Sequence, residues 1–598
     1  MAKPFDDTFV GYYQKELSYL REAGLEFSKA YPALGKELGL LDTTSADPHV
    51  ERLIESFAFL TARMNQEIQD QLPDIAHHLL EELYPPFVEM RPACGIAQFN
   101  LDVSKNFSSS GVLIEKSSPL WALGEKDQHC KFQTVYPLTL WPVTLNPLAL
   151  SSCQLYDFLP LSDHGKRALV VRLSFPFDSP KNLKMDHLTF HLSGDFFQAL
   201  ALYEAFFSDQ SLKIYVKDEH GTIHKDFKFL PKGFDKSETL APHANVGHVG
   251  YELLLDYFHF PQKYLFFDLK GPWSNLEGKE IEIIIPLGKS DFLTPDALSN
   301  ALSIGTTPII NLFKKTADPI KLDHKSLNYR LSPDQRRETT TEVFRVLEAY
   351  SILNPQDDPK PLAPFYHFSY KTLDSSMFWI AKREASWQEH LPGSSIYLNF
   401  VDKKFNPLKN TQETIYVKTL CTNRFLSESL SAKTKLYYDQ TLPVSSIVLR
   451  DKPVNQHYAP KSGETLWRLV GLLKSYHRPL LEHENALSTL KEMLGLFCTS
   501  FKQGEQELQT LTGLNCTRVT KRLGKEAWRG FVEGLRVDLT VNRTLEAGQK
   551  SFLFASVLRH FFAQTIALGG FVELCFKTQD SKDESITWQA LENDQLLR

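Results

Sequence analysis

The stretch from residue 44 to residue 91 constrains the fold of this chain more than any other. Asp47 is a good helix N-cap, and Pro48 follows at the first helical position, where its missing N–H costs nothing. An apolar stripe then repeats every three or four residues, as on one face of a helix: Leu53, Phe57, Leu60, Met64 and Ile68. Pro73 is expected to end this helix, and a second short helix runs from there to Tyr84. The sequence therefore predicts a helical hairpin whose apolar stripe needs packing partners.

A second long helix is predicted over residues 8–30. Its apolar residues alternate steps of four and three, the spacing of a coiled-coil-like seam: Tyr13, Leu17, Leu20, Gly24, Phe27 and Tyr31. Pro32 ends this helix, and a short helix is expected over residues 34–40. The first 90 residues are therefore nearly all helical. Their spacing favours a bundle closed on itself, although an open unit that shares its seams with another chain fits the same pattern.

From Cys94 onward the pattern changes to short β-type segments separated by turn residues. One helix is predicted among them, over residues 196–207. Strands are predicted at residues 95–99, 132–136, 168–175, 187–192, 212–216, 251–255, 264–269 and 280–285. Short strands at this density indicate a sandwich or barrel with insertions.

A chain of 598 residues is expected to hold several domains. Residues 286–301 and 451–463 resemble linkers, and a β-rich region between them has strands at 395–400 and 414–420. The last part combines predicted helices at 464–476, 486–501 and 552–566 with a strand at 535–541. The predicted fold class is therefore α+β and multidomain. We expect an N-terminal helical unit, two β-rich domains and a C-terminal α+β domain, with the bounds 1–92, 93–298, 299–455 and 456–598.

Charge and cysteine content narrow the class of protein. The 66 basic and 72 acidic residues give a net charge of −6 without long like-charge blocks, which argues against a nucleic-acid-binding surface. Seven scattered cysteines without a C-x-x-C pair indicate reduced thiols in the cytoplasm. The N-terminus lacks an apolar signal-peptide core, and no run of 18 apolar residues exists. We therefore expect a cytoplasmic protein that does not insert into the membrane.

Motifs that carry chemistry are weak or incomplete. Gly288-Lys289-Ser290 ends like a phosphate loop, but Ile283 stands where that loop needs a glycine. His187 and His191 would lie about 13 Å apart on one face of a strand. His77 and His78 are adjacent on a helix, so they are expected to point to different faces and not to chelate a metal together. There is no G-x-S-x-G elbow. The sequence predicts no catalytic residue, metal site or cofactor.

Several blocks of sequence, in order along almost the whole chain, carry a resemblance to a known family. They are Tyr12-Tyr13-x-x-Glu16-Leu17-x-Tyr19-Leu20-Arg21, Asp47-Pro48-His49-Val50-Glu51-Arg52-Leu53, Pro308-Ile309-Ile310-Asn311-Leu312-Phe313, Cys421-Thr422-Asn423-Arg424, Trp528-Arg529-Gly530-Phe531-Val532-Glu533-Gly534-Leu535 and Phe552 to Phe562. In these blocks the chain resembles the TssF family, also called ImpG or VasA, of the bacterial type VI secretion system baseplate.

The resemblance implies a structural role. Two TssF copies would pair with one TssG to form a baseplate wedge that also carries TssE and TssK. Wedges of this kind surround the VgrG spike hub, and the sheath and inner tube are built on that platform in the cytoplasm, docked at the inner-membrane complex. The family has no known catalytic activity, metal or cofactor, so the resemblance implies a protein that is not an enzyme.

We therefore hypothesise that the N-terminal helical unit takes part in a core shared with TssG and with a second copy of the chain. The expected partner-binding residues are Tyr13, Leu17, Leu20, Phe57, Leu60 and Met64. Burial of the same residues inside an intramolecular bundle is the alternative interpretation. Two other functions stay open at this point, a carbohydrate-acting hydrolase with β-sandwich domains and a wedge protein of a contractile phage tail.

Overall fold

The structure is a computed structural model, and it describes most of residues 7–592. Outside the described residues lie the two chain ends, the side chains of 65–72, and the segments 38–46, 103–107, 126–127, 161–165, 176–178, 210, 242–248, 288–297, 299, 324–325, 354–355, 357, 367–376, 387–390, 402–412, 461, 475–485, 499–501, 523–530, 543–550, 567–568 and 580–584. The predicted Gly288-Lys289-Ser290 turn falls outside them. The chain forms two compact units, one of residues 1–88 with 460–474 and one of 89–459 with 475–598.

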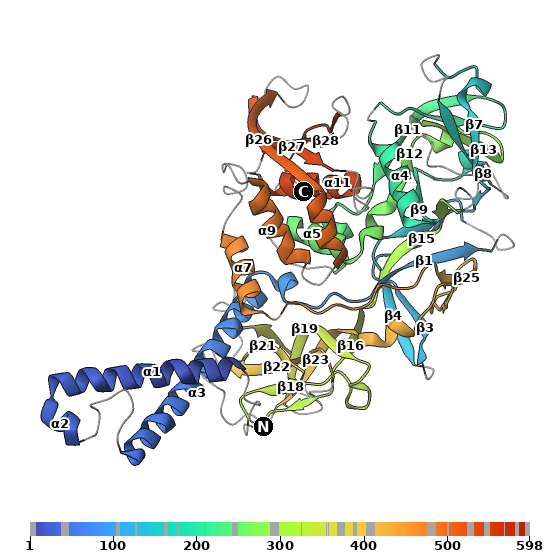
Figure 1. The fold of residues 1–598 in the computed structure, drawn as a ribbon. Helices are drawn as coiled ribbons and strands as arrows, with labels where there is room; N and C mark the ends of the chain where they lie inside the picture. Colours follow the sequence, from blue (N-terminus) through green and yellow to red (C-terminus); the bar gives the residue numbers. More distant parts are fainter. Residues whose placement is uncertain are drawn as a thin grey trace. The chain divides into compact units, whose positions relative to one another are not determined.

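The first unit is helical. It consists of α1 (Asp7–Ala30), α2 (Pro32–Glu37), α3 (Pro48–Leu83), a 3-10 turn at Pro85–Phe87 and α7 (Gly463–Lys474). Asp47 caps α3 as predicted, because its Oδ1 accepts a hydrogen bond from the His49 N–H at 2.8 Å and Pro48 takes the first helical position. Figure 1 shows α1 lying beside α3, with α2 at the end of α1.

The predicted hairpin is wrong, because α3 is one helix of 36 residues that continues through Pro73. A proline inside a helix removes one backbone hydrogen bond and costs about 3 kcal/mol. Packing against the proline ring helps to offset this cost. Gly463 opens α7 so close to that ring that a Cβ at position 463 would stand 2.7 Å from Pro73 Cγ. A helix brought in from the distant residues 463–474 therefore supports α3 where the local sequence would break it.

The second unit is built on sheets in which most strand pairs are antiparallel, and the pairs β20–β21 and β27–β28 are parallel. A six-stranded sheet has the order β24-β25-β1-β15-β4-β3, and a nine-stranded sheet has the order β14-β9-β12-β11-β10-β13-β8-β6, with β7 also on β8. The strands of the first are β1 (Cys94–Leu101), β3 (Pro119–Leu123), β4 (His129–Thr134), β15 (Thr306–Ile310), β24 (Lys435–Leu436) and β25 (Val444–Leu449). Those of the second are β6 (Thr144–Leu145), β7 (Ala149–Ser152), β8 (Arg167–Ser174), β9 (His187–Leu192), β10 (Ile214–Lys217), β11 (Ile223–Pro231), β12 (Phe266–Lys270), β13 (Glu280–Leu287) and β14 (Leu302–Ile304).

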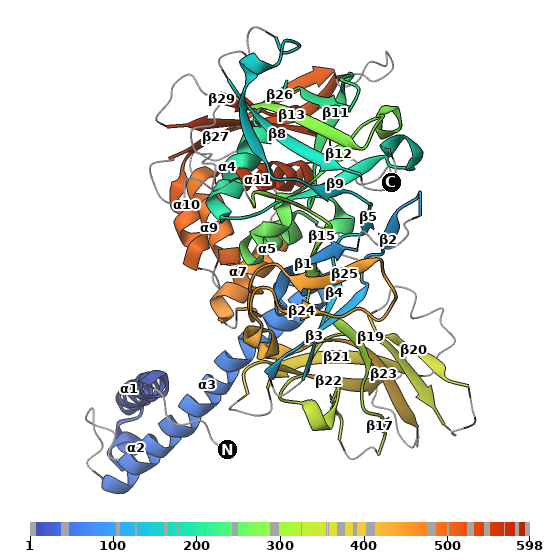
Figure 2. The same cartoon turned by 90° about the vertical axis from the view of Figure 1, so that its right-hand side faces the viewer.

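A third sheet of eight strands has the order β16-β23-β19-β20-β21-β22-β18, with β17 on β23 (Figure 2). Its strands are β16 (Phe313–Thr316), β17 (Ile320–Lys321), β18 (Tyr329–Leu331), β19 (Glu342–Ile352), β20 (Lys360–Pro364), β21 (Phe378–Ala385), β22 (Ser394–Val401) and β23 (Thr414–Thr422). The small pair β2 (Val112–Ile114) and β5 (Leu138–Leu140) stands apart.

The end of the chain forms a five-stranded sheet and several helices. The sheet has the order β26-β27-β28-β29, with β30 on β28. Its elements and helices are α9 (Ala486–Cys498), α10 (Lys502–Thr510), β26 (Leu511–Arg522), β27 (Phe531–Val541), α11 (Ser551–Thr565), β28 (Phe571–Thr578), β29 (Ser585–Thr587) and β30 (Leu591–Glu592). α11 packs against β28, α4 (Phe196–Phe207) and α5 (Val249–His259), so this sheet shares a core with helices from the middle of the chain.

The predicted fold class, α+β and multidomain with an N-terminal helical unit, is confirmed. The strand predicted at 251–255 is wrong, because these residues lie in α5. A short apolar run such as Leu253-Leu254-Leu255 fits a buried helix as well as a strand, and Tyr257 and Phe258 extend its buried surface along the helix. The four predicted domain bounds stay a prediction. Within the described part of the chain, no helix is both long and apolar enough to cross a bilayer.

Candidate assembly surface

The helix α3 carries two faces of different composition. Ala58 and Ala62 are fully buried, and Ile54 beside them is half-buried. At 100° per residue, this small-residue face lies roughly 130–140° around the helix from the apolar stripe predicted from the sequence. Alanine side chains on one side let another helix approach closely, while large apolar side chains stand on the other side.

Helix α1 packs on the small-residue face of α3. The rings of Phe9 and Phe59 meet edge to face with their centroids 5.2 Å apart. Arg21 Nε donates to Glu51 Oε1 at 3.0 Å, which ties the two helices together near the start of α3. The unit's own helices therefore contact α3 on the side away from its large apolar residues.

Four of the five residues of the predicted stripe on α3 are exposed, and the side chain of the fifth, Ile68, lies outside the described residues. Leu53, Phe57, Leu60 and Met64, which we call the α3 stripe, are 66, 65, 57 and 63% exposed. A cluster of large exposed apolar side chains on a protein surface usually indicates an interaction site. Completing the burial of each side chain would contribute about 1–2 kcal/mol. The α3 stripe is therefore a candidate surface for another helix or chain.

The six predicted partner-binding residues do not form one exposed seam. Phe57, Leu60 and Met64 belong to the exposed α3 stripe, whereas Tyr13, Leu17 and Leu20 on α1 are half-buried. Phe9, one helical turn before Tyr13 on the same side of α1, already contacts Phe59 of α3. Spacing alone identified an apolar side of α1 but not the helix that covers it.

His77 and His78 both reach the same carboxylate. Their Nδ1 atoms stand 3.8 and 3.1 Å from Glu81 Oε2, and the possible ligand atoms of all three residues fall within 4.8 Å of one another. The prediction that the two histidines point apart and cannot chelate together is therefore wrong. Both rings are turned toward Glu81, which lies about one helical turn later, and His78 is within hydrogen-bond distance of its carboxylate. The three half-buried side chains interact with one another, as in an ion-pair cluster. The predicted absence of a metal site stays a prediction.

A buried charge cluster sits under α5 in the second unit. Lys263 is fully buried, and its Nζ donates to Asp256 Oδ2 at 2.6 Å. Burial, with a smaller contribution from the Asp256 charge, raises the pKa of Glu252 to about 7. Lys263 therefore neutralises Asp256, while Glu252, which is 5% exposed, is left with a carboxyl group that ionises only near neutral pH.

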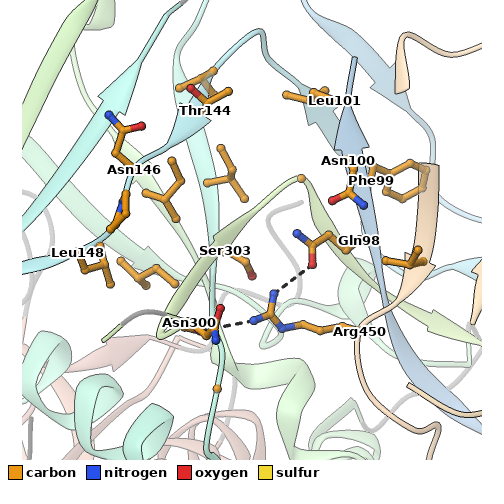
Figure 3. Close-up of a pocket in the computed structure, with 18 of the residues that line it drawn as sticks. Gln98, Phe99, Asn100, Leu101, Thr144, Asn146, Leu148, Asn300, Ser303 and Arg450 are labelled. Atoms are coloured by element: carbon orange, nitrogen blue, oxygen red, sulfur yellow. Dashed lines mark hydrogen bonds between the residues drawn. The ribbon is translucent and has the colours of Figure 1, made fainter. Parts of the chain in front are cut away.

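Strands of the nine-stranded sheet and of the six-stranded sheet line an open cavity of about 1050 Å³ (Figure 3). Its walls come from β1, β6, β14 and β25 and from nearby loops. Among the described residues of this lining Asp451 is the only carboxylate, whereas glycoside hydrolysis requires a pair. The two edge strands β6 and β14 approach within 8 Å between Cα atoms without pairing.

Two of the sequence blocks that carry the family resemblance meet through their asparagines. Asn311 Nδ2 donates to Lys131 O at 2.6 Å and to Asn423 Oδ1 at 3.1 Å. In return, the Asn423 N–H donates to Asn311 Oδ1 at 2.7 Å. Asn311 is fully buried, so both ends of its amide need these partners. This contact joins β15 and β23 across 112 positions of sequence.

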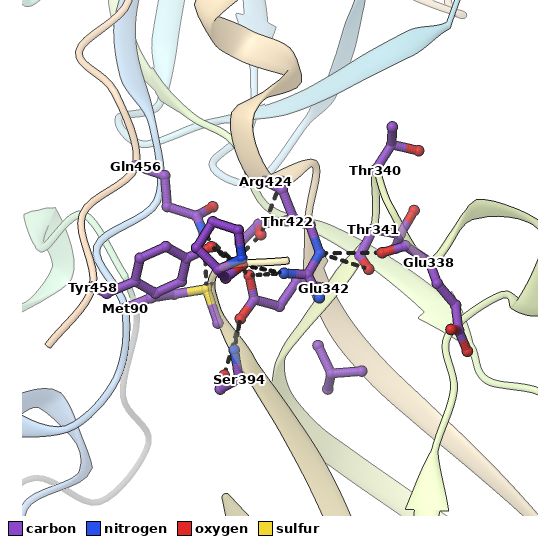
Figure 4. A network of polar contacts seen from close by, with 12 residues as sticks. Met90, Glu338, Thr340, Thr341, Glu342, Ser394, Thr422, Arg424, Gln456 and Tyr458 are labelled. Carbon is purple, nitrogen blue, oxygen red and sulfur yellow. Dashed lines mark hydrogen bonds and ion pairs between the residues drawn. The ribbon is translucent and has the colours of Figure 1, made fainter. Parts of the chain in front are cut away.

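A buried ion pair lies next to this contact (Figure 4). Glu342 is 1% exposed and stands 3.2 Å from Arg424 Nη1. The carboxylate also accepts hydrogen bonds from the N–H and hydroxyl of Ser394, from Gln456 Nε2 and from the hydroxyl of Tyr458. We call Glu342, Arg424 and these partners the Glu342 junction. Burial and the Glu342 charge raise the pKa of Tyr458 well above its ordinary value, which keeps this donor protonated.

The sequence analysis missed the Glu342 junction. A signal was present, because Asn311 interrupts the apolar run Ile309 to Phe313, and Thr422-Asn423-Arg424 follows the apolar end of a strand. A polar residue within an apolar run is expected to be buried, and a buried polar side chain needs hydrogen-bond partners. Among the described residues, Glu342, Ser394 and Arg424 border a pocket of only about 20 Å³, too small for a substrate, so the chemistry of the junction is that of structural cohesion.

Comparison with known proteins gives a consistent result. The family model described as Type VI secretion system, TssF matches residues 5–595. The Type VI secretion system component TssF1 of Pseudomonas aeruginosa is 26% identical over 97% of this chain and 98% of its own length.

Two solved structures share the fold. A chain of the TssK-TssF-TssG baseplate subcomplex, determined by cryo-electron microscopy, matches with a TM-score of 0.71 and 19% identity, over 91% of this chain and 99% of that chain. A chain of the baseplate complex from the type VI secretion system matches with a TM-score of 0.59 and 19% identity, over 97% of this chain and 99% of that chain. The fold of this chain is therefore also found in solved baseplate assemblies.

Proposed function

This chain belongs to the TssF family of type VI secretion system proteins and is a structural subunit of the baseplate wedge, and we propose that two copies assemble there with one TssG. The wedge would also carry TssK and TssE and would surround the VgrG hub, as a platform for the sheath and inner tube. The similar structure determined by cryo-electron microscopy is a subcomplex of TssK, TssF and TssG. That composition supports TssG and TssK as partners of this chain.

The observation that carries this proposal is the exposure of the α3 stripe. Four large apolar side chains stand more than half exposed on a 36-residue helix, and the helix that packs beside them covers the opposite side. A helix from TssG or from a second copy of this chain would bury the stripe by packing its own apolar side chains between them. The N-terminal helical unit is therefore the proposed site of wedge assembly.

We further propose that the chain is not an enzyme and that it works on the cytoplasmic side of the inner membrane. Membership of a family of baseplate components supports the first point. The buried polar groups of the Glu342 junction form hydrogen bonds and an ion pair with one another. Among its described lining residues, the cavity between the sheets has one carboxylate and not a pair. The lack of a bilayer-spanning helix among the described residues agrees with the second point.

The test is co-expression of the full chain with the TssG-like protein of the same bacterium, followed by affinity purification. Phe57→Asp would place an unpaired carboxylate in the shared core, at a cost of several kcal/mol, so co-purification should fall by a factor of about 100 or more. Leu155→Asp is the matched control, because Leu155 is 74% exposed and lies in the second unit. The proposal fails if the Phe57→Asp chain retains TssG at the yield of the parent and of the control.

A further inference from the structure

The cavity between the sheets of the second unit contains a cation without a counter-ion. The backbone N–H of Arg450 donates to Ile96 O at 2.9 Å, which anchors the residue after β25. Its guanidinium donates to Gln98 Oε1 at 3.2 Å and to Asn300 O at 3.4 Å (Figure 3). Both acceptors are neutral, and within the described part of the chain no carboxylate forms an ion pair with Arg450. Burial lowers the pKa of Arg450, although Asp451 partly opposes this. An incoming anion would stabilise this half-buried charge.

The neutral polar groups of the cavity offer hydrogen-bond acceptors. Asn100 Nδ2 donates to Ser446 Oγ at 3.0 Å, and Asn146 Nδ2 donates to Ser174 Oγ at 2.8 Å. These bonds orient both amides, and among the described residues no donor reaches either amide oxygen. Two fixed acceptors on the cavity wall suit the N–H groups of a peptide backbone.

The backbone of the cavity wall also has free edges. β14 pairs with β9 alone and β6 pairs with β8 alone, so each is an edge strand of the nine-stranded sheet. Residues of both strands line the cavity. These two edges approach within 8 Å between Cα atoms, whereas a strand inserted between them would need about 9–10 Å, so a bound peptide would lie along the cavity wall without joining the sheet.

Other ligand classes fit the lining less well. Phe99 is the only aromatic residue in it and is 2% exposed, so there is no platform on which a sugar ring would stack. A volume of about 1050 Å³ is far larger than a single inorganic anion needs. The apolar part of the lining is aliphatic, with Leu101, Leu145 and Leu148 among its residues, and it would accept the side chains of a peptide.

We propose that this cavity binds an extended acidic peptide segment of a baseplate partner, with a carboxylate of the segment on Arg450 and its backbone against Asn100 and Asn146. The inference rests on the proposed function, which supplies the partner proteins. Among the described residues that line the cavity, Arg450 and Lys433 are cations and Asp451 is the one anion. This net charge of +1 (2 − 1) favours an acidic segment over a basic one.

The experiment is site-specific photo-crosslinking in the purified complex with the TssG-like and TssK-like proteins. The photoreactive residue p-benzoylphenylalanine replaces Leu148 in the cavity lining, and in a parallel control it replaces the exposed Leu155, which lies outside the lining. After irradiation, mass spectrometry identifies the attached peptide. The expected result at position 148 is a cross-link to one segment of a partner that is rich in Asp and Glu.

Charge variants test the recognition. Arg450→Glu should lower the cross-link yield about tenfold or more, and Arg450→Lys should lower it less because the charge is kept. The thermal unfolding midpoint of each variant shows whether the fold is intact. If the Arg450 variants are unfolded, Lys433→Glu at the exposed rim takes their place, and it should lower the yield about threefold or more.

The outcomes separate this inference from the proposed function. If the complex forms but position 148 gives no more cross-linking than position 155, the peptide site is refuted and the wedge assignment stands. A cross-link to a segment without acidic residues, or one insensitive to the charge variants, also refutes it. If neither partner co-purifies with the parent chain, the proposed function fails and the peptide site fails with it.

Discussion

The α3 stripe exposes apolar side chains to solvent, whereas the Glu342 junction buries charged side chains in the protein interior. Phe57 and Leu60 of the stripe are more than half exposed, whereas Glu342 and Arg424 of the junction are 1 and 5% exposed. Apolar surface in water and charge in an apolar interior are both unfavourable without a partner. The junction contains its own partners, but α1 packs on another side of α3. This difference supports a junction that holds the fold of one chain and a stripe that joins two chains.

The largest effect is expected from Glu342→Ala. The substitution leaves Arg424 buried without its carboxylate and also removes the acceptor of Ser394, so the free energy of unfolding of the second unit should fall by about 3–5 kcal/mol. Urea unfolding followed by tryptophan fluorescence measures this loss. Glu348→Ala is the matched control, because Glu348 pairs with Lys418 where both side chains are more than half exposed. If the two variants unfold at the same urea concentration, the junction does not hold the fold.

Glu252→Gln tests a buried carboxyl group that burial destabilises in its ionised form. Its folded pKa of about 7 lies above its ordinary value of 4.5, so the folded state holds the proton more tightly than the unfolded state. Stability should therefore fall as pH rises from about 4.5 to about 7, and the loss persists above pH 7. The glutamine variant should be more stable than the parent by on the order of 2–3 kcal/mol at pH 8 and equal to it at pH 4.5. Parallel urea titrations at the two pH values would refute this if the difference were the same at both.

Ala62→Leu tests the covered side of α3 against the exposed side. Ala62 is fully buried, so extra methyl groups would push α1 away and cost about 1–3 kcal/mol in the helical unit. Leu60→Ala, two residues earlier on the exposed stripe, should change the stability of the free chain by less than about 0.5 kcal/mol. Urea unfolding followed by circular dichroism at 222 nm compares the two variants. Equal losses would show that the stripe is already buried within the chain.

The parts of the fold that could be predicted from sequence are those set by local periodicity and capping. The helix at 196–207 and the strand at 187–192 formed with their predicted bounds, and the structure shows Asp195 as the N-cap of that helix. Pro73 was misjudged because the helix that packs on it comes from residues 463–474. Local sequence cannot supply a contact made at that separation.

The candidate site was predictable to a similar extent. Spacing placed Phe57, Leu60 and Met64 on one face of a helix, but it could not tell whether α1 or another chain covers that face. It gave no sign that Asn311 pairs with Asn423, because the pairing depends on how β15 and β23 meet in space. The turn of His77 and His78 toward Glu81 was also missed, because it depends on side-chain rotation and not on position along the helix.

The smallest predicted effect concerns the aspartate that caps one helix in each of the two units. Asp47 caps α3 and Asp195 caps α4, each by accepting hydrogen bonds from backbone N–H groups. Asp47→Ala and Asp195→Ala should each cost about 1 kcal/mol of local helix stability. Only α3 carries the proposed binding stripe, so Asp47→Ala should weaken binding to the TssG-like protein about fivefold while Asp195→Ala leaves it unchanged. Titration calorimetry with both variants checks this, and equal affinities would mean that the start of α3 has no part in assembly.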